Sequence, residues 1–335
     1  MLSGLEHPSH FELTEARKEI YASCRPSETN AISYITMSNS ILSLTSLALF
    51  ALALSGSPAI AAPASFLKVG NGSIAYEDSG GSGPLVVCVP GMGDVRRQYR
   101  FLAPALAGAG YRVVTMDLRG MGESSVDWPD YSAAAVGSDI VALIEHLGAR
   151  RAFVIGNSMA AAAAVCAAAQ VPDRVSGVVL IGPFARDVPA PWWSGPVLKV
   201  AMMRPWGAAS WSMYYKSLYP TSPPSDLDEY RHALRDNLKQ PGRMEALQQM
   251  IAASKAPCEA RIPEVKAPVL VLMGTRDPDF ADPAAEAKLV ADRLHGRLVM
   301  VDGAGHYPHA EMPGEVGPVI TKFLGGLNGG EKTGA

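Results

Sequence analysis

One serine of this chain occupies a position that suits nucleophilic catalysis. Ser158 lies in the segment Gly156-Asn157-Ser158-Met159-Ala160, between a strand-like apolar run and a small-residue segment with helical character. A tight strand-to-helix turn holds its central residue in a strained conformation that exposes the side chain, and small residues two positions away let strand and helix approach closely. The spacing therefore predicts that Ser158 is a nucleophile. The alternative is a serine that only caps the following helix.

A serine hydroxyl attacks efficiently only when a base removes its proton, so a histidine is required. His306 follows the strand-like run 297–301 and lies in a glycine-flanked loop. Active sites of open parallel sheets collect beyond the carboxyl ends of the strands, which favours His306 over the helical histidines. His309 is the nearby reserve.

The base needs a carboxylate that fixes its tautomer. The apolar run 268–273 ends in Gly274-Thr275-Arg276-Asp277-Pro278-Asp279, which offers two. We predict Asp277 as the acid and keep Asp279 as the alternative.

Backbone amides are expected to hold the developing oxyanion. One is the amide of Met159, at the start of the helix that follows the nucleophile. The other is the amide of Met92, in the glycine-containing loop 90–94 after the run 85–89, where the backbone can approach a bound anion. The two methionine side chains are expected to line an apolar acyl pocket.

Parallel strands and helices must position these residues. Short β-branched runs alternate with helix-length segments from about residue 65, which predicts an α/β fold with a mostly parallel, doubly wound sheet. The pair 66–69 and 73–78 predicts an antiparallel hairpin at the sheet edge. The expected strands are 85–89, 111–116, 152–156, 177–182, 268–273 and 297–301, and the clearest helices are 133–147 and 283–294.

The interval 183–263 interrupts this alternation because it is rich in tryptophan and tyrosine and lacks a convincing strand. Its length predicts an inserted helical cap over a pocket, or else a helical layer that only shields the sheet. The hydrolase-like core is then 63–182 together with 264–328, followed by a flexible tail at 329–335.

Composition narrows the function classes. The 335 residues are 48% hydrophobic with a net charge of −3, and no basic run is interleaved with aromatic residues. A nucleic-acid partner is therefore not expected, and a small-molecule substrate is the better prediction. The four cysteines, Cys24, Cys88, Cys166 and Cys258, match no metal-binding spacing and are interpreted as packing residues.

Residues 1–62 are expected to lie outside the catalytic fold. Residues 41–54 form a charge-free apolar run, and a small-residue pattern typical of signal-peptidase cleavage ends near residues 61–62. This predicts a secreted or periplasmic protein. An uncleaved membrane anchor and a cytoplasmic chain remain alternatives, as do starts at Met1 and Met37. Any membrane contact is expected only through this segment, and oligomeric state is left open.

Five motifs together resemble the α/β-hydrolase superfamily over about residues 65–326. They are VPGMGD at 89–94, DLRGMGES at 117–124, GNSMA at 156–160, GTRDPD at 274–279 and GAGHYPH at 303–309. The resemblance implies nucleophile Ser158, acid Asp277, base His306 and oxyanion donors Met92 and Met159. It also implies a structural turn at Asp117, Arg119 and Gly122. Pro90 replaces the usual histidine of the oxyanion loop, which affects that loop's hydrogen bonds.

The expected function is hydrolysis of a small carboxylic ester or related acyl compound. GNSM is similar to the tetrapeptide of carbon–carbon hydrolases that act on ring-cleavage products, so such a hydrolase is the first alternative. A small-molecule binding protein on the same scaffold is the second. Haloalkane dehalogenases and epoxide hydrolases carry aspartate at the elbow, where this chain has serine. No cofactor is expected, and no metal, because His306 and His309 lack further zinc ligands.

Overall fold

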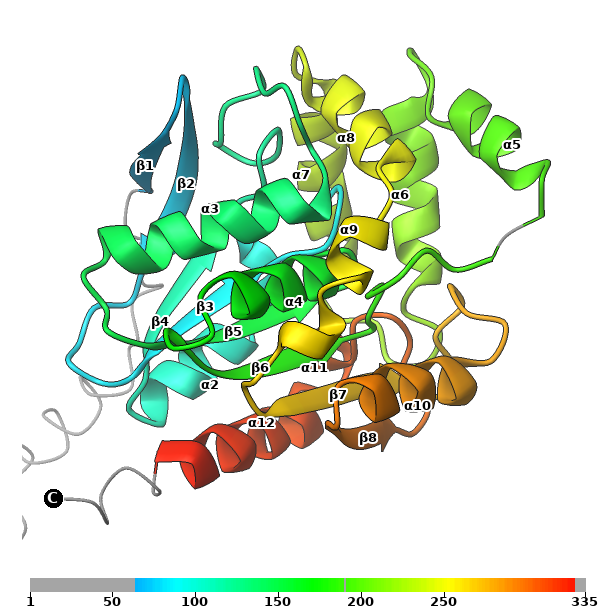
Figure 1. Ribbon diagram of the computed structural model, residues 1–335. Coiled ribbons are helices and arrows are strands. Elements are labelled where there is room, and N and C mark those ends of the chain that lie inside the picture. The colour runs from blue at the N-terminus through cyan, green and yellow to red at the C-terminus, as the bar shows by residue number, and fades with distance from the viewer. Residues whose placement is uncertain (1–63, 190, 329–335) are drawn as a thin grey trace, which may run out of the picture. The chain divides into compact units, whose positions relative to one another are not determined.

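The described part of the chain contains a single eight-stranded sheet. The structure is a computed structural model that describes residues 64–189 and 191–328 (Figure 1). The strands lie in the order β1-β2-β4-β3-β5-β6-β7-β8. Their bounds are Ser65–Val69 (β1), Gly72–Asp78 (β2), Leu85–Val89 (β3), Arg112–Met116 (β4), Ala152–Asn157 (β5), Val175–Ile181 (β6), Val269–Gly274 (β7) and Arg297–Val301 (β8).

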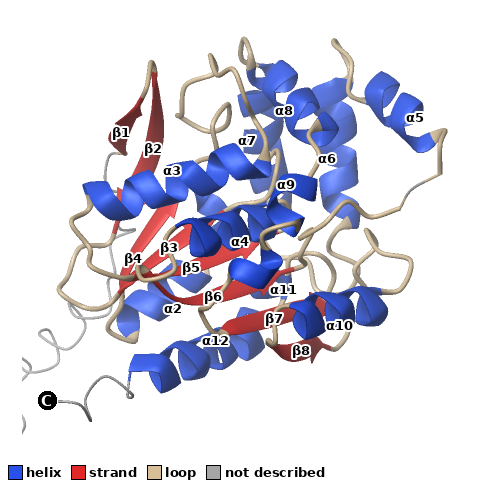
Figure 2. Ribbon diagram, viewed as in Figure 1, coloured by secondary structure: helices blue, strands red, loops and turns tan. Residues whose placement is uncertain are grey.

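Most neighbouring strands run parallel. Only the hairpin β1–β2 and the pair β2–β4 are antiparallel, and they lie at one edge of the sheet (Figure 2). The five pairs from β4–β3 to β7–β8 are parallel. The predicted mostly parallel sheet with an antiparallel edge hairpin is confirmed.

Helices cover both faces of this sheet, which explains why the central strand β3 is apolar and buried at every position. In β3, Val87 packs in the hydrophobic cluster on one face and Val86 in the cluster on the other. The first face carries α3 (Ala133–His146), α4 (Ala160–Gln170) and α10 (Pro283–Arg293), and the second carries α2 (Leu102–Gly108) and α12 (Pro313–Asn328).

Local sequence signals set where these helices begin and how closely they pack. The Ser132 side chain accepts a hydrogen bond from the Ala135 amide at the start of α3. Asp282 does the same for Ala285 at the start of α10, where Pro283 takes the first helical position. The small residues of α4 let it lie close to α3, since a β-carbon built at Gly137 would lie 2.8 Å from Cys166 Cβ.

Two short helices follow strands outside the long interval between β6 and β7: η1 (Arg96–Tyr99) follows β3 and α11 (Pro308–Glu311) follows β8.

The long interval between β6 and β7 contains helices and loops, and no strand, in its described residues. The helices of the interval, hereafter the insertion, are α5 (Ser194–Ala201), α6 (Gly207–Ser217), α7 (Leu227–Lys239), α8 (Arg243–Ala252), α9 (Ala256–Glu259) and η2 (Ile262–Glu264).

The turn after β4 is held by buried charge. Asp117 accepts hydrogen bonds from the amides of Arg96 and Glu123 at 2.7 and 2.9 Å. Gly122 has a φ of +56°, and a β-carbon there would lie 2.0 Å from an Asp117 oxygen. Arg119 forms a bidentate pair with buried Asp139 at 2.8 and 2.7 Å. These contacts fit the structural turn that the resemblance implied.

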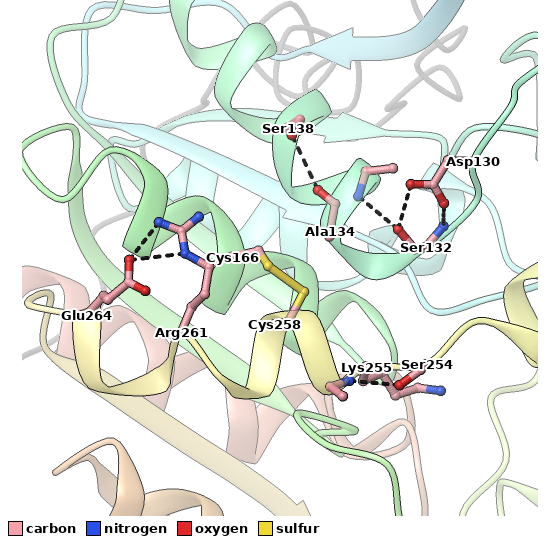
Figure 3. Close-up of a disulfide and its surroundings, with 12 residues drawn as sticks. Asp130, Ser132, Ala134, Ser138, Cys166, Ser254, Lys255, Cys258, Arg261 and Glu264 are labelled. Carbon is pink, nitrogen blue, oxygen red and sulfur yellow. Dashed lines mark hydrogen bonds and ion pairs between the residues drawn. A yellow bond between two sulfur atoms is a disulfide. The ribbon is translucent and has the colours of Figure 1, made fainter.

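The interpretation of all four cysteines as packing residues is wrong for two of them. Cys166 of α4 and Cys258 of α9 form a disulfide, with Cα atoms 5.1 Å apart (Figure 3). Their sequence separation of 92 residues hides this pairing from any local pattern. Cys88 is a buried free thiol, whereas Cys24 lies outside the described residues.

The predicted signal segment and the predicted tail at 329–335 also lie outside the described residues. Within residues 64–189 and 191–328, no helix is both long and apolar enough to cross a bilayer.

Loss of the disulfide should destabilise the protein. Cys258→Ser is expected to lower the free energy of unfolding by about 4 kcal/mol, because the cross-link closes a long loop in the unfolded chain. Urea unfolding of the oxidised wild type and of the variant measures this difference. Cys88→Ala is the control, and its unfolding should keep its sensitivity to reductant. Equal midpoints for oxidised and reduced wild type would contradict the cross-link.

Candidate active site

Ser158 lies at a strained turn between β5 and α4. Its φ is +57°, in the left-handed region that non-glycine residues seldom adopt. Hydrogen bonds hold this backbone on both sides: the Ser158 amide donates to Ile181 at 2.9 Å, and its carbonyl accepts from Phe184 at 3.2 Å. The surrounding structure therefore determines a conformation that the residue alone would avoid.

The small residues around Ser158 are required by the close approach of strand and helix. A β-carbon built at Gly156 would lie 2.3 Å from the carbonyl oxygen of Ala160. No side chain fits at Gly156 without moving α4, which explains the sequence pattern on both sides of the serine.

His306 lies in the loop after β8 and is joined to Asp277 in the loop after β7. The His306 Nδ1 atom is 2.8 Å from Asp277 Oδ2, and both side chains are almost fully buried. Because a carboxylate only accepts, Nδ1 carries the hydrogen and Nε2 is left to face a partner. Asp279 Oδ2 is farther from the same nitrogen, at 3.6 Å. Of the two carboxylates that the sequence offered as the acid, Asp277 is thus the one that accepts a hydrogen bond from His306.

The backbone of His306 is held from two directions. Its amide donates to the Leu218 carbonyl at 3.0 Å, after α6 of the insertion. The His306 carbonyl accepts from Asn157 Nδ2 at 3.2 Å. Asn157 Nδ2 also donates to the Ile181 carbonyl at 3.0 Å. The side chain of Asn157, the residue directly before Ser158, therefore joins the turn after β5 to the loop that carries His306. Sequence reasoning missed this role.

Two carboxylates control the charge of His306. Burial disfavours the imidazolium, but the charges of Asp277 and Asp279 outweigh burial and raise the pKa of His306 to about 9. Burial also raises the pKa of Asp279. The Tyr214 hydroxyl of α6 donates to Asp279 at 2.7 Å, so the insertion contributes to this charge cluster.

Ser158 and His306 line one cavity of about 290 Å³. Within the described residues no hydrogen bond joins the Ser158 hydroxyl to His306, although the pair faces the same space. Such bonds are often long before substrate binds. The cavity is lined by Met92, Ser158, Phe184, Leu198, Trp211, Tyr214, Leu218, Ile251, Lys255, Asp279, His306 and Tyr307.

The amides of Met92 and Met159 donate no hydrogen bond to any group in the described part of the chain. Gly91, next to Met92, approaches the turn so closely that a β-carbon there would lie 3.1 Å from Ser158 Cβ. Met159 is the N-cap residue of α4, where the helix dipole favours negative charge. Both amides are thus free to bind a ligand oxygen.

Gln98 and His309 support the loop 90–94, in which proline stands at the position where the resemblance implied a histidine. Gln98 Oε1 accepts from the Gly91 amide at 2.8 Å, and Gln98 Nε2 lies 3.1 Å from His309 Nε2. Burial, with the charges of Arg100 and His306, lowers the pKa of His309 to about 3. His309 stacks on Tyr99 and does not line the cavity, so it supports this loop and is not placed as a second base.

The insertion also holds this loop through buried Asp94. Its carboxylate accepts from the hydroxyls of Tyr215 at 2.8 Å and Tyr230 at 2.5 Å. Burial raises the pKa of Asp94 to about 6 against these hydrogen bonds. Trp211 Nε1 adds a bond to the Gly93 carbonyl at 3.2 Å. No local sequence signal pairs these residues, because they are more than one hundred positions apart.

One group in the described residues has a composition that could hold a metal ion. Ligand atoms of Asp277, Asp279 and His306 lie within 4.8 Å of one another. His306 thus has two ligand-type neighbours, whereas His309 is not part of this group. In this structure the His306 Nδ1 atom is engaged by Asp277, and Asp279 is engaged by Tyr214.

A family described as alpha/beta hydrolase fold matches residues 84–313. Epoxide hydrolase B of Mycobacterium tuberculosis is 43% identical over 106 residues, which covers 31% of this chain and only 30% of that enzyme. The 2-hydroxy-6-oxo-6-phenylhexa-2,4-dienoate hydrolase of Comamonas testosteroni is 28% identical over 271 residues, or 74% of this chain and 90% of that enzyme.

Solved structures also show that the chain has this fold. A hydrolase from Pseudomonas aeruginosa superposes with a TM-score of 0.67 at 25% identity, covering 79% of this chain and 99% of that one. A bromoperoxidase from Bacillus anthracis, at 23% identity, has a TM-score of 0.69 over 78% of this chain and 99% of its own, which shows the fold alone.

The two carboxylates beside His306 make its titration testable. We expect an imidazole pKa of about 9 by NMR, and Asp279→Asn should lower that pKa by about one to three pH units because one of the two negative charges is lost. Glu315→Gln, at an exposed site, removes the same charge elsewhere and should leave the His306 pKa unchanged. An unaltered pKa in Asp279→Asn would disprove this electrostatic account.

Proposed function

The chain belongs to the α/β-hydrolase fold family, and we propose that it is a serine hydrolase that cleaves a small carboxylic ester or a related acyl compound through an acyl-enzyme intermediate. The observation that carries this proposal is the hydrogen bond from His306 to buried Asp277, because His306 and Ser158 line the same cavity. A strained serine, an oriented imidazole and two free amides form the combination that acyl transfer needs.

In the proposed reaction, Ser158 Oγ attacks the substrate carbonyl carbon while the neutral form of His306 accepts the hydroxyl proton at Nε2. Because the pKa of His306 is raised to about 9, the population of this reactive neutral form grows as the pH rises toward that value. The carbonyl electron pair moves to oxygen, and the amides of Met92 and Met159 bind this oxyanion. Collapse breaks the bond to the leaving alcohol, which takes the proton from His306. Water then attacks the acyl-enzyme with the same proton transfers, releasing the acid and restoring Ser158.

Asp277 keeps the imidazole in the required tautomer and stabilises the imidazolium during both steps. The insertion acts as a cap in this proposal. Its residues Leu198, Trp211 and Ile251 complete an apolar cavity around the reacting carbonyl, and its tyrosines hold the loop that carries Met92. Exclusion of water strengthens each of these electrostatic contacts.

A carbon–carbon hydrolase is the second candidate. The dienoate hydrolase of Comamonas testosteroni aligns over most of its length with this chain, which favours a related cleavage. Epoxide hydrolysis receives less support, because the match to epoxide hydrolase B is local and enzymes of that type carry aspartate where this chain has Ser158.

Covalent labelling tests the proposed nucleophile. A fluorophosphonate should label Ser158, and Ser158→Ala should reduce hydrolysis of short activated esters by about 10⁴-fold because no acyl-enzyme can form. Ser138→Ala, at an exposed helical serine, is the matched control and should retain labelling and activity. A chain that binds small molecules without labelling would instead be a binding protein.

The same preparation discriminates ester from carbon–carbon cleavage. Rates on a panel of esters, lactones and dienoate-type diketones should be highest for esters. A strong preference for the diketones, with slow ester cleavage, would replace our proposal by the second candidate.

We also propose that the chain is exported. The apolar run 41–54 and the small-residue pattern before residue 62 support a cleaved signal, and the Cys166–Cys258 disulfide suits an oxidising compartment. In a bacterial expression host, we expect periplasmic protein whose N-terminus begins near residue 62 or 63. Protein found only in the cytoplasm with residues 41–61 intact would refute export.

A further inference from the structure

Lys255 is a buried cation in the same cavity as Ser158 and His306. Its residue exposure is 9%, and it is the N-cap residue of α9. Most of the cavity around it is apolar. The apolar lining comprises Met92, Phe184, Leu198, Trp211, Leu218 and Ile251.

Within residues 64–189 and 191–328, the Lys255 ammonium group has no acceptor at hydrogen-bond distance. Its nearest acidic partner is Asp187, whose Oδ1 atom is 3.9 Å from Lys255 Nζ, beyond hydrogen-bond distance. Asp187 is already occupied at the start of α9: it accepts from the Lys255 amide at 2.9 Å and from the Ser254 hydroxyl. Among the described residues no side chain or carbonyl accepts a hydrogen bond from this ammonium.

Asp279, the carboxylate that lines the same cavity, does not supply the missing partner. It accepts from Tyr214 and lies 3.6 Å from His306 Nδ1, and no ion pair joins it to Lys255 in the described residues. The cavity therefore holds an anion beside the imidazole and a separate, poorly partnered cation.

Burial disfavours the charged form of Lys255 and lowers its pKa, and the charge of Asp187 at 3.9 Å only partly offsets this. A bound anion would provide the acceptors that the protein does not. Lysine serves such a role as a compact positive charge with three donors.

The position of Lys255 is fixed by its surroundings. Figure 3 shows Lys255 and Cys258 on the same short segment, α9, with Cys258 joined to Cys166 on α4. Because α4 begins directly after the turn that carries Ser158, the disulfide and the hydrogen bond from the Lys255 amide to Asp187 hold the backbone of Lys255 near the helix that follows the nucleophile.

We propose that Lys255 determines specificity by binding a carboxylate that the substrate carries in addition to its reacting acyl group. The substrate class is then anionic: a monoester of a dicarboxylic acid, or an acylated hydroxy acid. This inference rests on the proposed function for the cleaved bond, whereas the carboxylate subsite is a separate property of the cavity.

Matched ester pairs test the subsite. The 4-nitrophenyl monoesters of succinic, glutaric and adipic acid carry the carboxylate on the acyl part, and the butanoate, pentanoate and hexanoate esters are their neutral counterparts. On the alcohol side, 3-acetoxypropanoate is compared with propyl acetate. We expect the wild type to prefer the anionic member of at least one pair, and the preferred pair locates the carboxylate.

Substitution of the lysine should remove this preference selectively. Lys255→Met, which keeps most of the length of the side chain and removes its charge, should lower kcat/KM for the preferred anionic ester about 10- to 100-fold, mainly through KM, because a charge-assisted hydrogen bond is lost. Its effect on the neutral ester should be less than about threefold. Lys255→Arg should restore part of the preference. Lys199→Met, at an exposed lysine of α5 outside this cavity, is the matched control and should behave as wild type.

Two results would overturn the proposal: no preference for any anionic ester, or equal losses on anionic and neutral esters in Lys255→Met, which would indicate a structural role. Binding without turnover separates this proposal from the proposed function. Calorimetry compares 5-oxohexanoate with 2-hexanone. Lys255-dependent binding of the former, in a protein that cleaves no ester and takes no fluorophosphonate label, would support the subsite and reject ester hydrolysis. Absence of both binding and turnover would reject both.

Discussion

The hydrogen bond between His306 Nδ1 and Asp277 Oδ2 is the contact on which the rest of the site depends. It joins the loops after β7 and β8, and the parallel pairing of these strands brings the two loops to the same edge of the sheet. Burial makes this bond strong and also makes its loss costly, since either partner alone would be a desolvated polar group. The bond engages Nδ1 of the imidazole and leaves Nε2 available to the cavity that His306 lines together with Ser158, which lies in the turn after β5.

The insertion is part of this site and does more than cover the sheet. Its α6 and α7 supply the tyrosines that bind Asp94, and the residue after α6, Leu218, accepts from the His306 amide. The loop that carries Met92 and the loop that carries His306 are therefore both held by the same helices. A displacement of these helices would move both loops, so cavity shape and site geometry are coupled.

Opposite charges occupy the cavity without neutralising each other. Asp279 lies beside His306 and contributes to its raised pKa, whereas the one acidic contact of Lys255 among the described residues is Asp187, at 3.9 Å. The disulfide joins α9, which begins after Lys255, to α4. A cavity that contains a separate anion and cation suits a substrate that is itself polar at a defined place. Its apolar lining suits the hydrocarbon between those polar groups.

The sequence alone indicated the sheet, because strands that are covered on both faces are rich in apolar residues. It also indicated the tight turn at Ser158, through the small residues that such a turn requires on either side. It also indicated the loops that carry Asp277, His306 and Met92, since each follows a recognisable strand. Tertiary structure decided what depends on distant partners. Asp277 and Asp279 could be told apart only by their distances to His306 Nδ1, which differ by less than an ångström. The tertiary structure also paired Cys166 with Cys258 and joined Asp94 to two tyrosines of the insertion. It also showed that no described residue lies close enough to accept a hydrogen bond from the Lys255 ammonium. Such contacts leave no periodicity in the sequence, because they are set by how helices and loops meet after the sheet has formed.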